Sequence, residues 1–296
     1  MSNLILFDFH QGNLGQSLQQ KLGAVAGEIN RREFPDGETY LQVESQVTGC
    51  DCLVLADLSW PNSKYLPLLF LAETLRELGA RSVGLVAPYL CYMRQDKRFI
   101  EGEAVTSAIF ARHLSTFVDW LLTVDPHLHR YNSLDEIYTI PSEVVAGAPA
   151  LANWLKDQQN LLLVGPDEES RQWVAEIAGV AGHPFVVGSK QRFGDQDVQV
   201  TLPDLSAYQD YTAVIVDDVI SSGYTILKAM QALQLQGFKR VQCIAVHGIF
   251  ANNSDDLLYK AGLHQLVTSN TITHTSNGVD IAPLLIAPIK RLLEQT

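Results

Sequence analysis

The chain has 296 residues, 47% of them hydrophobic, which is enough for two domains that each bury a core. Its formal net charge at pH 7 is −12, and a protein whose main task is to neutralise a nucleic-acid backbone is rarely so acidic. No early segment has the basic-then-apolar pattern of a signal peptide, and no stretch approaches the roughly 20 apolar residues that span a bilayer. We therefore expect a cytoplasmic protein that binds neither nucleic acid nor a membrane.

The four cysteines lie in or beside apolar runs, at Cys50, Cys52, Cys91 and Cys243. The Cys50-x-Cys52 spacing alone is weak evidence for a metal. We expect reduced thiols with a packing role, as in a cytosolic protein.

Strand patterns alternate with helical periodicity along the whole chain. Strands are predicted at 1–9, 52–58, 83–87, 120–124, 161–164, 185–187, 211–216, 241–246 and 265–268, and an alternating stretch at 29–46. Helices are predicted at 14–22, 65–78, 105–114, 148–155, 171–178, from 226 onward, 255–260 and 281–293. This alternation predicts an α/β fold with mainly parallel sheets and helices on both faces. Two domains are expected, at 1–145 and 146–296.

The segment Arg94-Gln95-Asp96-Lys97-Arg98 follows the predicted strand 83–87. Its cations suit a polyphosphate, and its planar groups suit stacking on a base or amide contacts with it. The chain has neither a G-x-x-x-x-G-K-[ST] loop nor a G-x-G-x-x-G motif, so a bound nucleotide needs another holder. Taken alone, the segment is more simply explained as a solvated charged loop.

Asp125-Pro126-His127 follows the predicted strand 120–124 and places a carboxylate and an imidazole two residues apart. The pair suits one metal, bound directly or through water, and His129 extends it to a His-x-His pattern. A hard cation such as Mg²⁺ prefers oxygen ligands and keeps waters, so His127 would act through water or on a phosphate. A surface histidine is the alternative on spacing alone.

Lys190-Gln191-Arg192 lies between Gly188 and Gly194 and is predicted to be a loop. Two cations on a glycine-flanked loop suit a lid over a phosphoryl group in transfer. The alternative is a basic turn that balances Asp195 and Asp197.

The stretch Tyr211–Met230 is the most informative part of the sequence. A predicted strand is followed by Asp217 and Asp218, the small-residue loop 221–225 (SSGYT) and a helix. Amides and the dipole at a helix N-terminus make an anion site, to which the loop hydroxyls add donors. Because paired aspartates repel a phosphate, they suit ribose hydroxyls or a metal carried by a diphosphate. The stretch predicts a sugar-phosphate site, and an ordinary strand–turn–helix is the alternative.

Five segments in this order resemble the ribose-phosphate diphosphokinases, or PRPP synthetases. They are FPDGE at 34–38, PYLCYMRQDKRF at 88–99, DPH at 125–127, SKQR at 189–192 and VDDVISSGYT at 216–225. The resemblance implies two domains similar to type I phosphoribosyltransferases. It implies transfer of the β,γ-diphosphoryl group of Mg-ATP to the anomeric hydroxyl of ribose 5-phosphate, which gives 5-phosphoribosyl 1-diphosphate (PRPP) and AMP. It also implies a homo-oligomer built from dimers, as a tetramer or hexamer.

The resemblance also implies a role for particular residues. ATP would be bound by Asp36, Gly37 and Glu38 of a neighbouring subunit and by Arg94, Gln95 and Asp96. Mg²⁺ or its waters would be bound by His127, Asp167 and Asp125, with Lys190 as the catalytic lysine and Arg192 as its partner. Ribose 5-phosphate would be bound by Arg192, Asp217, Asp218, Ser221, Ser222, Gly223, Tyr224 and Thr225.

Two departures from the family pattern keep other functions open. SSGYT stands where DTGGT is common, and Lys-Gln-Arg at 190–192 stands where Lys-Arg-Arg is common. One alternative is a phosphoribosyltransferase that consumes PRPP, against which the RQDK segment and a whole first domain argue. The other is a catalytically silent, synthetase-like regulatory subunit, against which the presence of Lys190, Arg192 and His127 argues.

Overall fold

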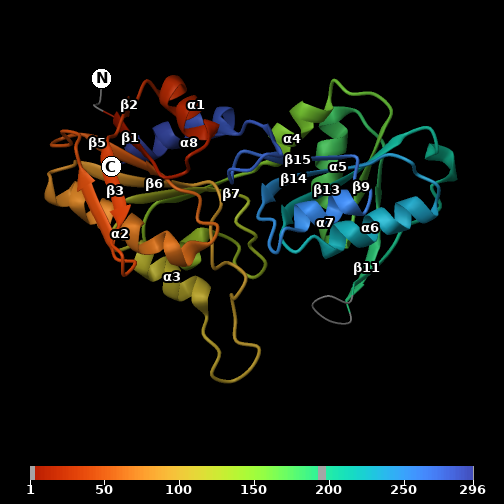
Figure 1. Cartoon of the computed structure of the whole chain (residues 1–296), viewed down its shortest axis with the longest axis horizontal. Helices are drawn as coiled ribbons and strands as arrows, with labels where there is room; N and C mark the ends of the chain where they lie inside the picture. The colour runs from red at the N-terminus through yellow and green to blue at the C-terminus, as the bar shows by residue number, and fades with distance from the viewer. Residues whose placement is uncertain (1–3, 193–197, 296) are drawn as a thin grey trace. The chain divides into compact units, whose positions relative to one another are not determined.

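The computed structural model describes residues 4–192 and 198–295, and the chain forms two compact units. Unit 1 comprises Met1–Ala146, Thr271–Thr273 and Ala282–Thr296, and unit 2 comprises Gly147–Asn270 and His274–Ile281. Each unit is a six-stranded parallel sheet with helices packed against it (Figure 1), so the predicted fold class is confirmed. The predicted division between residues 145 and 146 stays a prediction. The two compact units are not continuous in sequence, because the last helix belongs to unit 1. No helix in the described ranges is long and apolar enough to cross a membrane.

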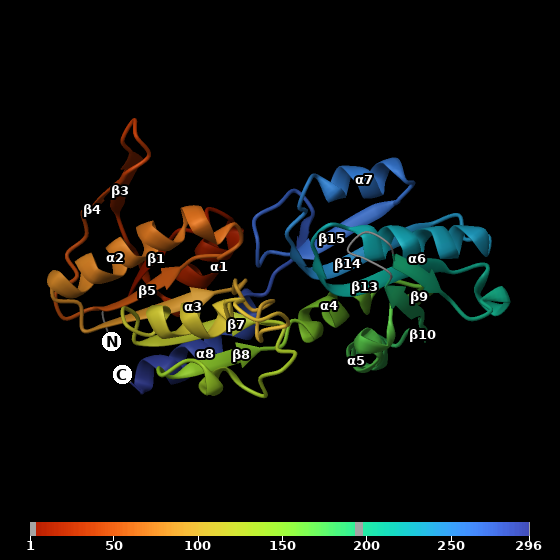
Figure 2. The same cartoon turned by 90° about the horizontal axis from the view of Figure 1, so that it is seen from below.

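In unit 1 the strand order is β2-β1-β5-β6-β7-β8. The elements are β1 (Leu4–Asp8), α1 (Asn13–Leu22), β2 (Val25–Ala26), β3 (Ile29–Glu33), β4 (Thr39–Val43), β5 (Asp51–Leu55), α2 (Tyr65–Glu77), β6 (Ser82–Ala87), α3 (Thr106–Leu114), β7 (Trp120–Val124), β8 (Ser142–Val145) and α8 (Ala282–Glu294), with short 3-10 turns at Pro61–Ser63 and Leu134–Glu136. Strands β3 and β4 form an antiparallel hairpin that extends away from the rest of the unit (Figure 2).

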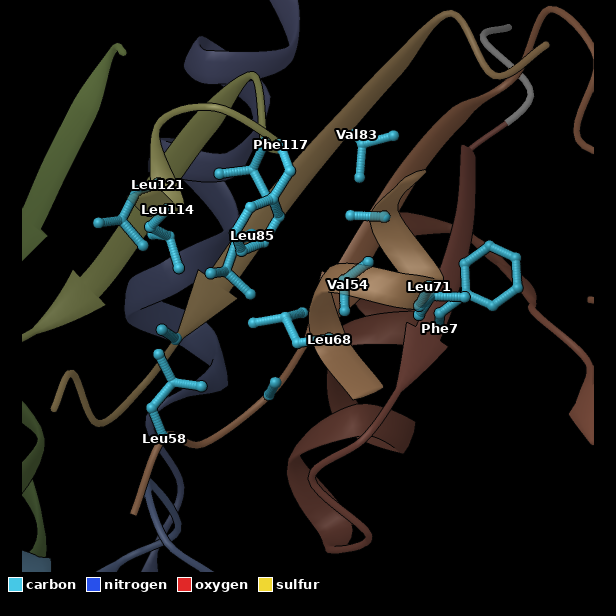
Figure 3. Packing of buried hydrophobic residues seen from close by; sticks show 14 of the residues in the cluster. Phe7, Val54, Leu58, Leu68, Leu71, Val83, Leu85, Leu114, Phe117 and Leu121 are labelled. Carbon is cyan, nitrogen blue, oxygen red and sulfur yellow. The ribbon is translucent and has the colours of Figure 1, made fainter. Parts of the chain in front are cut away.

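A core of unit 1 forms where α2 and α3 pack on the sheet (Figure 3). Leu68 and Leu71 of α2 and Leu114 of α3 are buried with Val54 of β5 and Leu85 of β6. Because successive side chains of a strand point to opposite faces, these two strand residues mark one face of the sheet. The strands are apolar at nearly every position, as is typical of a parallel sheet buried on both faces.

The other face of this sheet is buried as well. Leu53 and Leu55 alternate with Val54 along β5 and are also fully buried. Helix α8 contacts β7, β8 and α1, so a segment from the end of the chain completes the first unit. Gly84 of β6 makes room for the buried indole of Trp120, because a Cβ at 84 would lie 2.0 Å from that ring.

Unit 2 repeats this arrangement, with the strand order β10-β9-β13-β14-β15-β16. Its elements are α4 (Ala148–Leu155), β9 (Leu161–Gly165), α5 (Arg171–Ala181), β10 (Phe185–Val187), β11 (Ser189–Arg192), β12 (Val198–Thr201), β13 (Thr212–Ile220), α6 (Tyr224–Leu235), β14 (Val241–Gly248), α7 (Ser254–Lys260), β15 (Gln265–Ser269) and β16 (Asn277–Val279), with 3-10 turns at Glu168–Ser170 and Ser206–Tyr208. Helix α6 packs Ile226, Met230 and Leu233 on Ile215 and Cys243 of the sheet.

Because every strand pair in both main sheets is parallel, the carboxyl ends of the strands in each unit lie along one edge. In unit 1 this edge gathers the segments that follow β1, β5, β6 and β7. In unit 2 it gathers those that follow β9, β13 and β14. Ligands of open α/β sheets bind at this edge, so the fold brings most of the predicted site residues to the expected places.

Two local predictions are corrected. The sequence places the end of a strand at Val216, but β13 continues to Ile220 because β14 is long enough to pair with it, with Ile220 opposite Gly248. Asp217 and Asp218 therefore lie within the strand. The segment 189–192 is not a loop but strand β11, because it pairs antiparallel with β12, whose sequence VQVT at 198–201 has the alternation of a strand.

Candidate active site

Three carboxylates meet at the carboxyl edge of unit 2. Asp217 and Asp218 lie in the last part of β13, and Asp167 follows the neighbouring strand β9. Burial of its carboxyl, and then repulsion from Asp218 and Asp167, raises the pKa of Asp217 well above its ordinary value. A partner that brings positive charge or hydrogen-bond donors would relieve this repulsion, and a divalent cation and sugar hydroxyls are such partners.

The loop Ser221–Gly223 connects β13 to α6. Gly223 is the N-cap of α6 with a φ of 73°, and a Cβ there would lie 3.0 Å from the Cβ of Ser254. The hydroxyl of Ser254, at the start of α7, donates to the carbonyl of Ser221 at 2.7 Å and so fixes the loop. The first turn of α6, which begins with Tyr224 and Thr225, carries no acidic side chain. Its first amides have no partner within the helix, so this end of α6 is suited to an anion.

Lys190 and Arg192 lie on β11, in register with Val200 and Val198 of β12. The structure describes only their backbone, and residues 193–197, which include Gly194, lie outside the described ranges. The catalytic roles predicted for the two side chains stay predictions.

The segment 94–98 lies at the carboxyl edge of unit 1, after β6. Arg94 is exposed and Gln95 is half-buried, but Asp96 is buried. The carboxylate of Asp96 accepts a hydrogen bond from Nη1 of Arg130 at 2.7 Å, so it is engaged by the protein itself. Contact of these three residues with ATP stays a prediction.

Asp125 and His127 follow β7, the strand beside β6, and so share this edge. Both residues have positive φ angles, 36° and 58°, and strained backbone of this kind gathers at functional sites. Nε2 of His127 lies 2.7 Å from Nε2 of His129, so the two imidazoles share a hydrogen bond. Within the described ranges, no group of three or more histidine, cysteine or acidic residues is arranged to hold a metal ion.

The residues Asp36, Gly37 and Glu38 form the exposed tip of the β3–β4 hairpin. Gly37 has a φ of 88°, which glycine adopts without strain, and the amide of Phe34 donates to the carbonyl of Glu38 at 2.8 Å. The tip is therefore a closed turn on a protruding hairpin. Its contact with a nucleotide of a neighbouring subunit stays a prediction.

Comparison with known proteins shows which family the chain belongs to. Residues 5–117 match the model of the N-terminal domain of ribose phosphate pyrophosphokinase, and residues 133–277 match the phosphoribosyl transferase domain. The ribose-phosphate pyrophosphokinase of Methanobrevibacter smithii is 32% identical, over 91% of this chain and 96% of the relative. The chain belongs to the ribose-phosphate pyrophosphokinase family.

Further ribose-phosphate pyrophosphokinases agree with this assignment. Those of Sulfolobus acidocaldarius and Methanopyrus kandleri are 33% and 30% identical, over 90% and 94% of this chain and 92% and 96% of the relatives. The crystal structure of the phosphoribosylpyrophosphate synthetase from Mycobacterium smegmatis aligns over the whole of both chains with a TM-score of 0.83, at 23% sequence identity, which supports the fold. The predicted resemblance and the two phosphoribosyltransferase-type domains are confirmed.

A buried polar cluster at the carboxyl edge of unit 1 was not predicted. Asp57, two residues beyond β5, accepts hydrogen bonds from Nζ of Lys64 at 2.7 Å and from the hydroxyl of Ser59, and lies 3.4 Å from Nδ1 of His10. Burial opposes its ionisation, but the contact with His10 and the hydrogen bonds from Lys64 and Ser59 hold the pKa of Asp57 below its ordinary value. Asp57 falls inside the strand predicted at 52–58, whereas β5 ends at Leu55 and leaves Asp57 at the sheet edge, as β7 leaves Asp125.

Proposed function

We propose that this chain transfers the β,γ-diphosphoryl group of Mg-ATP to the anomeric hydroxyl of ribose 5-phosphate and releases PRPP and AMP. The proposal is supported by membership of the ribose-phosphate pyrophosphokinase family and by two segments at sheet edges, a charged segment whose side chains suit ATP and a loop that suits a sugar phosphate. The segment is 94–98 in unit 1, and the loop is Ser221–Gly223 in unit 2.

Ribose 5-phosphate suits the end of β13 and the start of α6. Its phosphate would take hydrogen bonds from the first amides of α6 and from the hydroxyls of Ser221, Ser222 and Thr225. Its ribose hydroxyls would donate to Asp217 and Asp218, whose mutual repulsion makes donors favourable there. The sugar would thus be oriented before the reaction begins, which removes part of the entropic barrier.

Ribose-phosphate pyrophosphokinases are magnesium-dependent as a family, and the acidic residues here have suitable donor chemistry. Asp125 and Asp167 offer hard carboxylate oxygens, and His127 would act through a coordinated water. When bound, Mg²⁺ would offset the negative charge of the polyphosphate.

The transfer builds negative charge on the equatorial oxygens of the β-phosphorus, which fixed cations stabilise. We assign this task to Lys190 and Arg192. The segment Arg94, Gln95 and Asp96 holds ATP, with Arg94 and Gln95 in contact with the nucleotide, and a neighbouring subunit contributes the hairpin tip at 36–38. The working form is then a cytoplasmic homo-oligomer built from dimers.

The test is an incubation of the purified protein with ATP, Mg²⁺ and ribose 5-phosphate, with and without inorganic phosphate. AMP and PRPP should form in equal amounts, and neither should form without the sugar phosphate. A phosphoribosyltransferase would instead consume PRPP and a base and release diphosphate. A silent regulatory subunit would give no AMP under any of these conditions, and either outcome would refute the proposal.

A further inference from the structure

The backbone of Gln95 and Asp96 is held by side chains from two other segments. The hydroxyl of Ser107, in the first turn of α3, donates to the carbonyl of Gln95 at 3.2 Å. The hydroxyl of Tyr131 donates to the carbonyl of Asp96 at 3.2 Å, and the two hydroxyl oxygens lie 3.0 Å apart. Consecutive carbonyls of the segment are therefore tied to α3 and to the loop that follows β7.

The side chain of Asp96 is tied to the same loop. It is only 2% exposed and pairs at 2.7 Å with Arg130, whose own side chain is 42% exposed. A buried carboxylate is costly unless a hydrogen-bonded partner compensates it, so the guanidinium determines where Asp96 can lie. Arg130 and Tyr131 thus hold the middle of the segment from side chain and backbone together.

Arg130 also contacts the outer end of the segment. Its Cζ lies 5.2 Å from the centre of the exposed Phe99 ring, and Nζ of Lys97 lies 4.6 Å from the same ring. The carboxylate of Glu103 accepts the amide hydrogens of Phe99 and Ile100, which closes the turn beyond it. The guanidinium of Arg130 therefore contacts both the buried Asp96 and the exposed Phe99.

We propose that Arg130, assisted by Tyr131, is a positioning residue for the nucleotide. It fixes the backbone at residues 95 and 96 so that the exposed Arg94 and the half-buried Gln95 keep the orientation that ATP requires. Asp96 acts through this ion pair. The inference rests on the proposed function, because it takes the segment 94–96 to be the ATP-binding one. Arg130, which holds that segment in place, lies three residues beyond His127 in the same loop.

The matched control is the ion pair of Arg81 and Asp51 in the same unit. Asp51 is 4% exposed and Arg81 is 50% exposed, close to the values for Asp96 and Arg130. Arg81 precedes β6 and Asp51 begins β5, so this pair lies at the amino edge of the sheet, away from the proposed site. Arg81→Ala should lower stability much as Arg130→Ala does, but it should leave nucleotide affinity unchanged.

The experiment measures KM for both substrates, kcat, the Tm and the equilibrium Kd for Mg-ATP without sugar phosphate. Arg130→Ala should raise the KM and Kd for ATP by about tenfold or more, since a misplacement of ~1 Å can cost ~100-fold. Its KM for ribose 5-phosphate should not change. Arg130→Lys should recover part of the affinity, because it keeps the charge but loses the planar contacts.

If Arg130→Ala does not fold, Tyr131→Phe serves instead, since it removes one hydroxyl and should raise the KM for ATP alone. The inference is overturned if the ATP constants of these variants change no more than those of Arg81→Ala, or if both KM values rise together. A wild-type protein that binds Mg-ATP but forms no AMP would refute the proposed function and leave the Kd comparison valid. A wild-type protein that does not bind Mg-ATP would refute both.

Discussion

Asp217 of β13 lies beside Asp167, which follows the neighbouring strand β9, and burial of the Asp217 carboxyl together with repulsion from Asp218 and Asp167 raises its pKa. A carboxyl whose folded pKa lies above its unfolded value binds more protons in the folded state. Its contribution to stability is therefore present at acid pH and is lost as the pH rises from the ordinary carboxyl range through the raised pKa. At neutral pH, repulsion among Asp217, Asp218 and Asp167 accordingly lowers the stability of the protein at the place where substrate should bind.

Asp167→Asn should relieve this repulsion. The amide oxygen can still accept from the amide of Ser170, as Oδ1 of Asp167 does at 3.2 Å, so the short turn keeps its cap. The free energy of unfolding at neutral pH should rise, because one of the two carboxylates that repel Asp217 is gone, and its decline with pH should weaken. Activity should fall. The measurement is denaturant unfolding between pH 4 and pH 8.

The control is Glu168→Gln, which removes the same charge one residue away. Glu168 is exposed and pairs with Arg171, not with the aspartates. Equal stabilisation by both variants would show that net charge, and not the contact with Asp217, is responsible.

Gly223→Ala tests the phosphate loop. At a φ of 73° an added Cβ is strained and meets Ser254, so the N-terminus of α6 should shift. We expect a loss of ~1 kcal/mol of stability and a rise of about tenfold in the KM for ribose 5-phosphate. Gly182→Ala is the control, because Gly182 has a φ of 77° at the end of α5 and no atom lies within 4 Å of an added Cβ. If both variants keep the wild-type KM, the loop does not hold the phosphate.

Lys190→Ala tests the catalytic assignment. The kcat should fall by about 10³-fold or more, because a preorganised cation in a site that excludes water is worth several kcal/mol to the transition state. Binding of ribose 5-phosphate, measured by calorimetry, should survive. Lys156→Ala, just after α4, is the surface control. Near-normal turnover in Lys190→Ala would remove this lysine from the mechanism.

Asp57→Asn tests the polar cluster of unit 1. Because the folded pKa of Asp57 is lowered, its contribution to stability is present above the ordinary carboxyl range and disappears as the pH falls through the folded pKa. The variant should lose about 3 kcal/mol at neutral pH, since Lys64 and His10 lose a buried partner. The difference from wild type should shrink on acidification. Asp157→Asn, a change at an exposed aspartate, is the control and should show neither effect. A stability difference between Asp57→Asn and wild type that does not depend on pH would contradict the stabilising role of the ionised Asp57.

The sequence predicted the parts of the fold and site that depend on neighbouring residues. Apolar strands and helical periodicity located the two parallel sheets, and the order Asp217, Asp218, then SSGYT located a helix N-terminus after a strand. The length of β13 could not be read in this way, because its last residues are strand only by pairing with β14. The return of α8 to unit 1 depends equally on distant partners.

The same limit applies to the contacts around the site. Asp96 is one of five polar residues in a charged segment, and only the fold shows that it is buried against Arg130. The link between Asp57 and His10 joins residues that follow two neighbouring strands, β5 and β1. Local patterns identify which residues carry chemistry, whereas the long-range pairs that orient them need the structure.

The most direct test of the central claim follows the fate of the β-phosphorus. ATP labelled at that atom is incubated with the purified protein, Mg²⁺ and ribose 5-phosphate, and the products are separated. The proposed reaction predicts that the label leaves the adenine nucleotide and appears in PRPP while unlabelled AMP accumulates. Label that stays in ADP, or in unreacted ATP while the sugar phosphate is unchanged, would contradict diphosphoryl transfer by this chain.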